Sequence, residues 1–237
     1  MPNSTAYSDL LAYHYSAYRP PLHALILKRL LAPENSFQTG VDIGCGTGYS
    51  ARALAPYCEH VYGVDPSQPM LSEAEPSATI TYQLGAAENT SLPNGVANII
   101  TYAGSLFYAD IALAVKELQR ISQPGTLVLI YDFSIIFAPF IEAHQLTVNE
   151  EENNYNHRCN FTGISGFHND AATVERLTFT ANAAQLAHLL LSEPQLYSAY
   201  CKRYHTQKPF DLLKKTLLKE SDAFAVEAEV FYTRYVL

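Results

Sequence analysis

Hydrophobic and polar positions follow two alternating patterns over the first half of the chain. Short apolar runs bounded by polar or turn-forming residues predict strands at 40–44, 60–65, 79–84, 98–103 and 126–133. Helical spacing lies between them, at about 48–57, from 67 onward and at about 110–121. Repeated strand–helix order places parallel strands in one sheet with helices on both faces. We therefore expect an α/β fold with a doubly wound, mostly parallel, seven-stranded Rossmann-like sheet.

The pattern changes before and after this region. Two N-terminal helices are expected at about 7–18 and 21–32. The alternation lapses over 134–172, a length typical of binding loops and lids, so we interpret this segment as a lid-like insertion. A strand at 173–180, helices at 182–192 and 210–219, and a final strand at 224–236 complete the chain. We expect one domain over 1–237, with a ligand-binding half at 34–133, the lid at 134–172 and the remaining elements at 173–237.

Charge and cysteine content narrow the class of protein. The chain has 15 Lys and Arg against 23 Asp and Glu, a formal net charge of −8, which disfavours nucleic acid as a partner. No apolar run is long enough to cross a bilayer, so we expect no membrane partner. The four cysteines form no C-x-x-C pair and show no zinc spacing, so we predict reduced thiols, no metal and a cytoplasmic protein without a signal peptide.

The segment VDIGCGTGYS, at 41–50, carries the clearest candidate chemistry. Gly44, Gly46 and Gly48 alternate between a predicted strand and a predicted helix, where glycine permits a tight turn and close approach of a ligand to the backbone. Asp65 ends the next predicted strand, where a carboxylate can accept hydrogen bonds from the two hydroxyls of a ribose. Together they predict a nucleoside site.

Two nucleoside ligands compete for this geometry. A dinucleotide site has the pattern G-x-G-x-x-G, but its third glycine position here is the bulky Tyr49. Asp42, two residues before Gly44, would repel a pyrophosphate and would suit a ligand that carries ammonium and sulfonium charges.

The chain resembles class I S-adenosylmethionine-dependent methyltransferases in VDIGCGTG (41–48) and VYGVDPSQPML (61–71). The segment GAAENTSLPNGVANIITYAGSLFYAD (85–110) is similar to later motifs of the methyltransferase type 11 branch. Within that branch, this segment and Tyr15 to Pro20 most resemble the trans-aconitate methyltransferase-like group. The specific resemblance covers about 15–133 and implies S-adenosylmethionine as cofactor and S-adenosylhomocysteine as product.

The resemblance implies a role for each matching residue. Gly44, Cys45 and Gly46 would line the methionine portion, with Asp42 near its amino group, while Asp65 would hold the ribose. Pro66, Ser67 and Met70 would flank the adenine, and the Ala87 backbone would meet its edge beside Glu88. Tyr102 and Ala103 would lie under the methionine portion, and Tyr15 and Arg19 would close the site.

The sequence departs from the family pattern at three places, which little affect the expected cofactor binding, and the last of them leaves the acceptor open. Ala86 and Asn98 replace acids, and Phe107-Tyr108 replaces a His-Trp pair. A proton-accepting group is needed only if the acceptor must lose a proton. The histidines of the expected lid (His144, His157 and His168) could do this, and we carry His168, Asp132 and Tyr108 as the catalytic candidates.

We expect methyl transfer to an oxygen, nitrogen or carbon atom of a small-molecule acceptor with aromatic or apolar surface, by in-line displacement. The 17 Tyr and 11 Phe favour such a pocket. Two alternatives stay open: an S-adenosylmethionine-binding enzyme of other chemistry, and a non-catalytic binding module. The sequence does not indicate an oligomeric state.

Overall fold

The computed structural model describes residues 4–148, 154–167 and 172–237. The described strands are β1 (Phe37–Ile43), β2 (Cys58–Asp65), β3 (Ile80–Leu84), β4 (Ala97–Ala103), β5 (Ser122–Ile135), β6 (Thr173–Asn182) and β7 (Ala223–Val236). The helices before β5 are α1 (Ser4–Ala17), α2 (Leu22–Leu30), α3 (Tyr49–Leu54), η1 (Ala55–Tyr57), α4 (Gln68–Ser72), η2 (Leu106–Tyr108) and α5 (Ile111–Ile121). Those after it are α6 (Ala138–Ala143), α7 (Ala183–Leu191), α8 (Pro194–Tyr204) and α9 (Phe210–Glu220).

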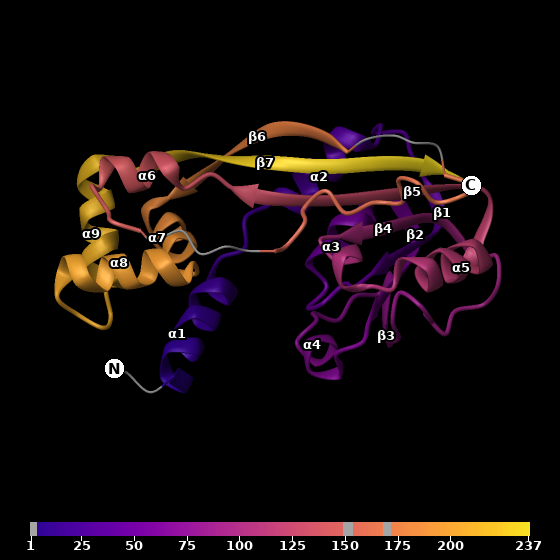
Figure 1. Ribbon diagram of the computed structural model, residues 1–237, viewed down its shortest axis with the longest axis horizontal. Coiled ribbons are helices and arrows are strands. Elements are labelled where there is room, and N and C mark those ends of the chain that lie inside the picture. Colours follow the sequence, from indigo (N-terminus) through magenta and orange to yellow (C-terminus); the bar gives the residue numbers. More distant parts are fainter. Residues whose placement is uncertain (1–3, 149–153, 168–171) are drawn as a thin grey trace. The chain divides into compact units, whose positions relative to one another are not determined.

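The strands form one seven-stranded sheet in the order β3-β2-β1-β4-β5-β7-β6. The pairs among the first five strands of that order are parallel. β7 runs antiparallel to β5, because the Leu237 N–H donates to the Thr126 carbonyl (3.0 Å) while the Ile136 N–H donates to the Glu227 carbonyl (2.9 Å). The mixed sheet confirms the expected α/β, Rossmann-like, mostly parallel architecture (Figure 1).

The chain divides into two compact units. Unit 1 contains Met1–Pro21, Ile135–Asn154 and Arg176–Ala228, and unit 2 contains Leu22–Ser134, Tyr155–Glu175 and Glu229–Leu237. The expected insertion at 134–172 is therefore not one body, because its two parts belong to different units. Its role as a lid stays a prediction.

Unit 2 is built around the parallel strands. Its core cluster joins inward residues of β1, β2, β4, α5 and β5, such as Val41, Ile100 and Val128. Phe161 and Phe167, from the expected insertion, lie in the same cluster, where the Phe161 ring is 4.8 Å from that of Phe167. The part of the insertion that follows residue 154 is thus anchored by buried rings.

Unit 1 contains the helices α1, α6, α7, α8 and α9 (Figure 1). Sequence patterning gave no helix at α6 or α8. Helix α8 begins with Pro194, which suits a first turn, and it buries Leu196, Tyr197 and Tyr200. Because tyrosine supplies two of these three large buried side chains, the apolar stripe is weak in the sequence. None of the described helices has both the length and the apolarity that a bilayer crossing requires.

Candidate nucleoside site

The loop after β1 is closely packed at Gly44 and open at Gly46. Both residues have positive φ angles, 75° and 53°, which favour glycine. A Cβ at Gly44 would overlap the Ser105 side chain, whereas a Cβ at Gly46 would meet no atom within 4 Å. Ser105 also donates its hydroxyl to the Ile43 carbonyl at 2.5 Å. The loop is therefore held from the β4 side and presents free space at Gly46.

Asp65, at the end of β2, is bonded to this loop. Its Oδ2 atom accepts the Gly46 N–H at 2.8 Å, and its Oδ1 atom accepts the Ser67 N–H at 2.8 Å. A carboxylate can accept about four hydrogen bonds, so each oxygen retains capacity for a ligand hydroxyl. The Asp65 side chain is buried except for a small exposed fraction. The predicted ribose-binding carboxylate and the predicted loop are therefore in direct contact.

Asp42 lies in β1 with no exposed surface. Its oxygens accept hydrogen bonds from the Ser50 hydroxyl (2.5 Å) and the Thr101 hydroxyl (2.7 Å). Burial raises the pKa of Asp42 to about 6, against the opposing effect of the two hydroxyls. The carboxylate thus joins α3 and β4 to β1, and its predicted contact with a ligand amino group stays a prediction.

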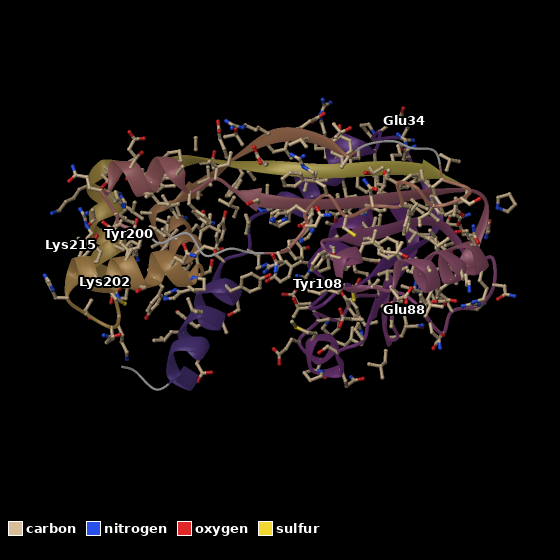
Figure 2. All side chains as sticks on the ribbon, viewed as in Figure 1. Glu34, Glu88, Tyr108, Tyr200, Lys202 and Lys215 are labelled. Carbon is tan, nitrogen blue, oxygen red and sulfur yellow. The ribbon has the colours of Figure 1, made fainter. Side chains whose placement is uncertain are left out.

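The predicted adenine residues follow β2 and β3. Ser67 caps α4 by accepting the Met70 N–H, and Met70 is exposed. Ala87 and Glu88 lie after β3, where Glu88 Oε1 accepts the Asp110 N–H at 2.6 Å. The structure therefore engages Glu88 with the residue that caps α5. Figure 2 labels Glu88 among the side chains of unit 2.

Tyr102 and Ala103 end β4, and only the second reaches the surface of unit 2. The Tyr102 side chain is fully buried and its ring lies 5.9 Å from that of Phe161. Burial also raises the pKa of Tyr102. The expected contact of Tyr102 with the methionine portion is therefore restricted to its backbone, because its side chain belongs to the core.

Asp132 belongs to a cluster of side chains that was not predicted from the sequence. Its Oδ2 atom lies 2.8 Å from His157 Nδ1 and 2.9 Å from the Tyr155 hydroxyl. The Tyr155 hydroxyl also lies 2.7 Å from the Gly104 carbonyl oxygen. His157 was one of three lid histidines in the sequence, and no pattern singled it out or linked Tyr155 to Asp132.

Aromatic rings extend from this cluster. The Tyr155 ring lies 4.8 Å from that of Phe107 and 5.8 Å from that of Tyr108. Tyr108, in η2, is 77% exposed and is labelled in Figure 2. His157 stacks on Phe231 of β7 with ring centroids 5.3 Å apart. The catalytic candidates Asp132 and Tyr108 are thus both adjacent to Tyr155.

The remaining candidates belong to unit 1 or lie outside the described residues. Tyr15 and Arg19 belong to unit 1, where the Arg19 guanidinium lies 3.8 Å from the centre of the Tyr15 ring. His144 is also in unit 1, buried and 2.6 Å from the Tyr200 hydroxyl. His168 lies outside the described residues. Among the residues that the structure describes, no group of three potential metal ligands occurs.

Comparison of the sequence with known proteins finds one family match. Residues 41–130 match the family described as "Methyltransferase domain". A Dictyostelium discoideum protein named as a methyltransferase is 30% identical over 96 residues, which are 40% of this chain and 36% of that protein. Malonyl-[acyl-carrier protein] O-methyltransferase of Serratia marcescens is 32% identical over 91 residues, 38% of this chain and 36% of that enzyme. The chain thus spans little more than a third of the length of these relatives.

Solved structures share the fold over most of the chain. A protein of Anaeromyxobacter dehalogenans described as a type II methyltransferase has a TM-score of 0.64 at 18% identity, covering 92% of this chain and 97% of that one. A protein of Bacillus halodurans described as a methyltransferase has a TM-score of 0.52 at 16% identity, covering 90% and 97%. These likenesses show the fold, and the family match over residues 41–130 is to a methyltransferase domain.

Proposed function

We propose that the protein transfers a methyl group from S-adenosylmethionine to a small-molecule acceptor. The observation that carries this proposal is the direct bond between Asp65 and Gly46. This bond sets the Asp65 carboxylate beside Gly46. Of Gly44, Gly46 and Gly48, Gly46 is the one at which an added Cβ would meet open space in unit 2.

The residues present fit a nucleoside without phosphates. Asp65 would accept the ribose hydroxyls with its remaining lone pairs, and the exposed Met70 would cover one face of the base. Asp42 and Asp65 give this end of the sheet negative charge and would attract a cationic ligand. Ala103, at the end of β4, would lie under the methionine portion.

When bound, the cofactor supplies an electrophilic methyl group on a sulfonium. The chain's own contribution is then to hold the acceptor in line and to exclude water, which can be worth roughly 7–11 kcal/mol in favourable cases. The carboxylate of Asp42, anchored by Ser50 and Thr101, would keep the loop in position and would lie near the amino group.

The acceptor that we propose is small, with aromatic or apolar surface, and the reaction is an in-line displacement. The exposed rings of Phe107 and Tyr108 support this class, and the net charge of −8 argues against nucleic acid. The four free thiols support a cytosolic location. The trans-aconitate methyltransferase-like grouping belongs to this proposal and has no further support.

Calorimetry tests the cofactor directly. The protein is titrated with S-adenosylmethionine, S-adenosylhomocysteine and NAD in separate experiments, and we expect the first two to bind and NAD not to bind. Binding of NAD alone would overturn the proposal. The variant Asp65→Ala removes the carboxylate of the proposed site. Asp222→Ala is its matched control, because Asp222 is an exposed aspartate.

A further inference from the structure

We propose that His157 is the general base of this site, oriented by Asp132, and that the acceptor is therefore an aryl compound with a proton on its attacking nitrogen or oxygen. The inference rests on the proposed methyl transfer. It replaces His168 with His157 as the histidine that accepts the proton, and it gives Asp132 a positioning role instead of direct catalysis.

The contact between Asp132 and His157 fixes the tautomer of the ring. A carboxylate only accepts hydrogen bonds, so Nδ1, at 2.8 Å from Asp132 Oδ2, carries the proton. The lone pair of the neutral ring is then on Nε2. In the described part of the chain, no hydrogen bond to Nε2 is found, and the His157 side chain is 33% exposed. Nε2 is therefore able to accept a proton from a ligand.

Asp132 is itself held on both oxygens. Oδ1 accepts the Phe133 N–H at 2.7 Å, and Oδ2 lies 2.9 Å from the Tyr155 hydroxyl. Burial and the neighbouring Asp132 raise the pKa of Tyr155, so this phenol stays protonated and serves as a donor. The Asp132 carboxylate therefore accepts from the Phe133 N–H and the His157 Nδ1–H, and it shares the one Tyr155 hydroxyl proton with the Gly104 carbonyl oxygen. Among these donors, His157 is the one with a basic lone pair, on Nε2.

The cluster is connected to the glycine loop by short steps within unit 2. Ser105 contacts Gly44 at the loop and follows Gly104 in the chain. A Cβ at Gly104 would lie 3.0 Å from Asp132 Oδ1 and 3.5 Å from the Tyr155 hydroxyl. Asp132 of β5 and the Tyr155 hydroxyl that it contacts therefore lie beside Gly104, which directly precedes the residue that contacts Gly44.

Rings beside the dyad indicate the acceptor class. The His157 ring stacks on the ring of Phe231. It also makes an edge-to-face contact with the Tyr155 ring, with the two ring centres 4.8 Å apart. Phe107 and Tyr108, both exposed, pack against that same tyrosine. Aromatic side chains bind flat apolar ligands by stacking and edge contacts. An aryl amine or a phenol satisfies both the rings and the base.

Methyl transfer at this site forms one bond, breaks one bond and moves one proton. A lone pair on the acceptor nitrogen or oxygen forms the new bond to the methyl carbon, and the electron pair of the broken carbon–sulfur bond stays on sulfur, which gives S-adenosylhomocysteine. The acceptor proton moves to His157 Nε2, and the ring becomes an imidazolium whose charge faces the Asp132 carboxylate. No oxidant, reductant or further reactant is consumed.

The charged and titratable groups around His157 come from several elements. Asp132 of β5 contacts it directly, Tyr155 faces it from the same segment, and Tyr108 lies beyond Tyr155. Arg158 extends over Phe231 with its guanidinium 5.6 Å from the ring centre, and Cys159 interacts with Tyr155.

The first experiment needs no turnover. Long-range proton–nitrogen spectra of the 15N-labelled protein report which ring nitrogen of each histidine is protonated, and the His157→Asn variant assigns the His157 signals. We expect the Nδ1–H tautomer with an unprotonated Nε2, with and without S-adenosylhomocysteine, and a shift toward the Nε2–H tautomer in Asp132→Asn. A wild-type Nε2–H tautomer would overturn the inference.

The second experiment measures transfer from methyl-labelled S-adenosylmethionine to three probes, 4-ethylphenol, 4-ethylaniline and 3-phenylpropanoate. We expect methylation of the phenol or the amine and none of the carboxylate. The His157→Asn variant keeps a donor to Asp132 but has no base, so the rate should fall by about 10²–10⁴-fold. Tyr155→Phe should lose less, and His205→Asn, a change at an exposed histidine of unit 1, should match the wild type.

The outcomes separate this inference from the proposed function. An acid limb in the wild-type pH profile that is absent in His157→Asn, with unchanged affinity for S-adenosylhomocysteine, supports the base. Transfer to the carboxylate alone, an unchanged rate in His157→Asn, or no transfer to the protic probes by a protein that binds S-adenosylhomocysteine overturns it. If the wild-type protein does not bind S-adenosylhomocysteine, the proposed function is overturned, and this inference falls with it.

Discussion

Asp65 Oδ2 accepts the Gly46 N–H at 2.8 Å, so the last residue of β2 is bonded to the middle of the loop that follows β1. The two residues are 19 positions apart, and the parallel register of β1 and β2 brings them together. The carboxylate therefore has two tasks: it shapes the loop, and it remains available for a sugar.

Replacing Asp65 tests both tasks. In Asp65→Ala, the loss of hydrogen bonds to a charged acceptor should weaken S-adenosylhomocysteine binding by about 1.5–3 kcal/mol, on the order of a 10- to 100-fold rise in Kd. Calorimetry gives the Kd, and Asp222→Ala is the surface control. An Asp65→Ala protein with the wild-type Kd would show that the ribose is not bound here.

Two glycine substitutions in the same loop should have different effects. Gly44→Ala places a Cβ on the Ser105 side chain, so it should lower the free energy of unfolding, with overpacking alone typically costing about 1–3 kcal/mol. Gly46→Ala enters open space and should cost only the left-handed conformation, about 1–2 kcal/mol. Its main effect should be on S-adenosylhomocysteine affinity, because the new methyl group occupies ligand space.

Urea unfolding and calorimetry on the two glycine variants distinguish these effects. Gly46→Ala should keep most of its stability and lose affinity. If it binds S-adenosylhomocysteine as the wild type does, the space at Gly46 is not where the ligand lies.

The buried Asp42 should make stability depend on pH. Its pKa is raised from 3.8 to about 6, so the folded protein keeps a proton that the unfolded chain has lost in this range. The contribution of Asp42 to stability is full below about 4 and falls as the pH rises through about 6. At about 1.4 kcal/mol per pKa unit, the change is on the order of a few kcal/mol.

The isosteric variant Asp42→Asn removes this titration. Relative to the wild type, its free energy of unfolding should increase between about pH 4 and pH 6, as measured by urea denaturation across that range. A constant difference between the two proteins would mean that Asp42 is ionised throughout.

Glu117 of α5 should make stability depend on pH in the opposite direction. It accepts hydrogen bonds from Arg120 (2.7 Å) and from the backbone and hydroxyl of Thr90 (2.7 and 2.6 Å), and the Arg120 bonds chiefly lower its pKa from 4.5 to about 2. The stabilisation is present above about 4.5 and is lost as the pH falls through about 2. Glu117→Gln should lower the free energy of unfolding at neutral pH by about 1–3 kcal/mol.

Urea denaturation at neutral pH and near pH 3 checks the Glu117 prediction. The difference between Glu117→Gln and the wild type should shrink at the lower pH. A difference that grows on acidification would contradict the lowered pKa.

The parallel part of the sheet was predictable because its strands are buried on both faces and therefore read as apolar runs. The predicted ends of the strands were less accurate where a strand continues through polar residues. Strand β1 begins at Phe37, three residues before the expected start, since Phe37 pairs with Cys58 and the Thr39 N–H is accepted by Asn98. Asn98 also donates to Gln123, a bond that an aspartate at this position could not make.

The contact between the glycine loop and Asp65 could be predicted because turn glycines and a strand-end acid have fixed spacing in this fold. The cluster of Asp132, Tyr155 and His157 could not, because two of its members lie in an irregular segment more than twenty positions from the third. Contacts of that kind have no period in the sequence. Tyr102 is a different case. Its position matches the family motif, but its side chain is fully buried in the core.

Unit 2 takes its residues from three separate stretches, and the last of them is Glu229–Leu237. The Leu237 N–H donates to the carbonyl of Thr126 in β5, and Tyr235 lies in the core cluster with Phe161. During synthesis on the ribosome, the glycine loop and Asp65 emerge long before these residues. A nascent chain can therefore hold every cofactor candidate of unit 2 and still lack part of its interior, and we expect ligand-assisted folding only after residues 229–237 have left the exit tunnel.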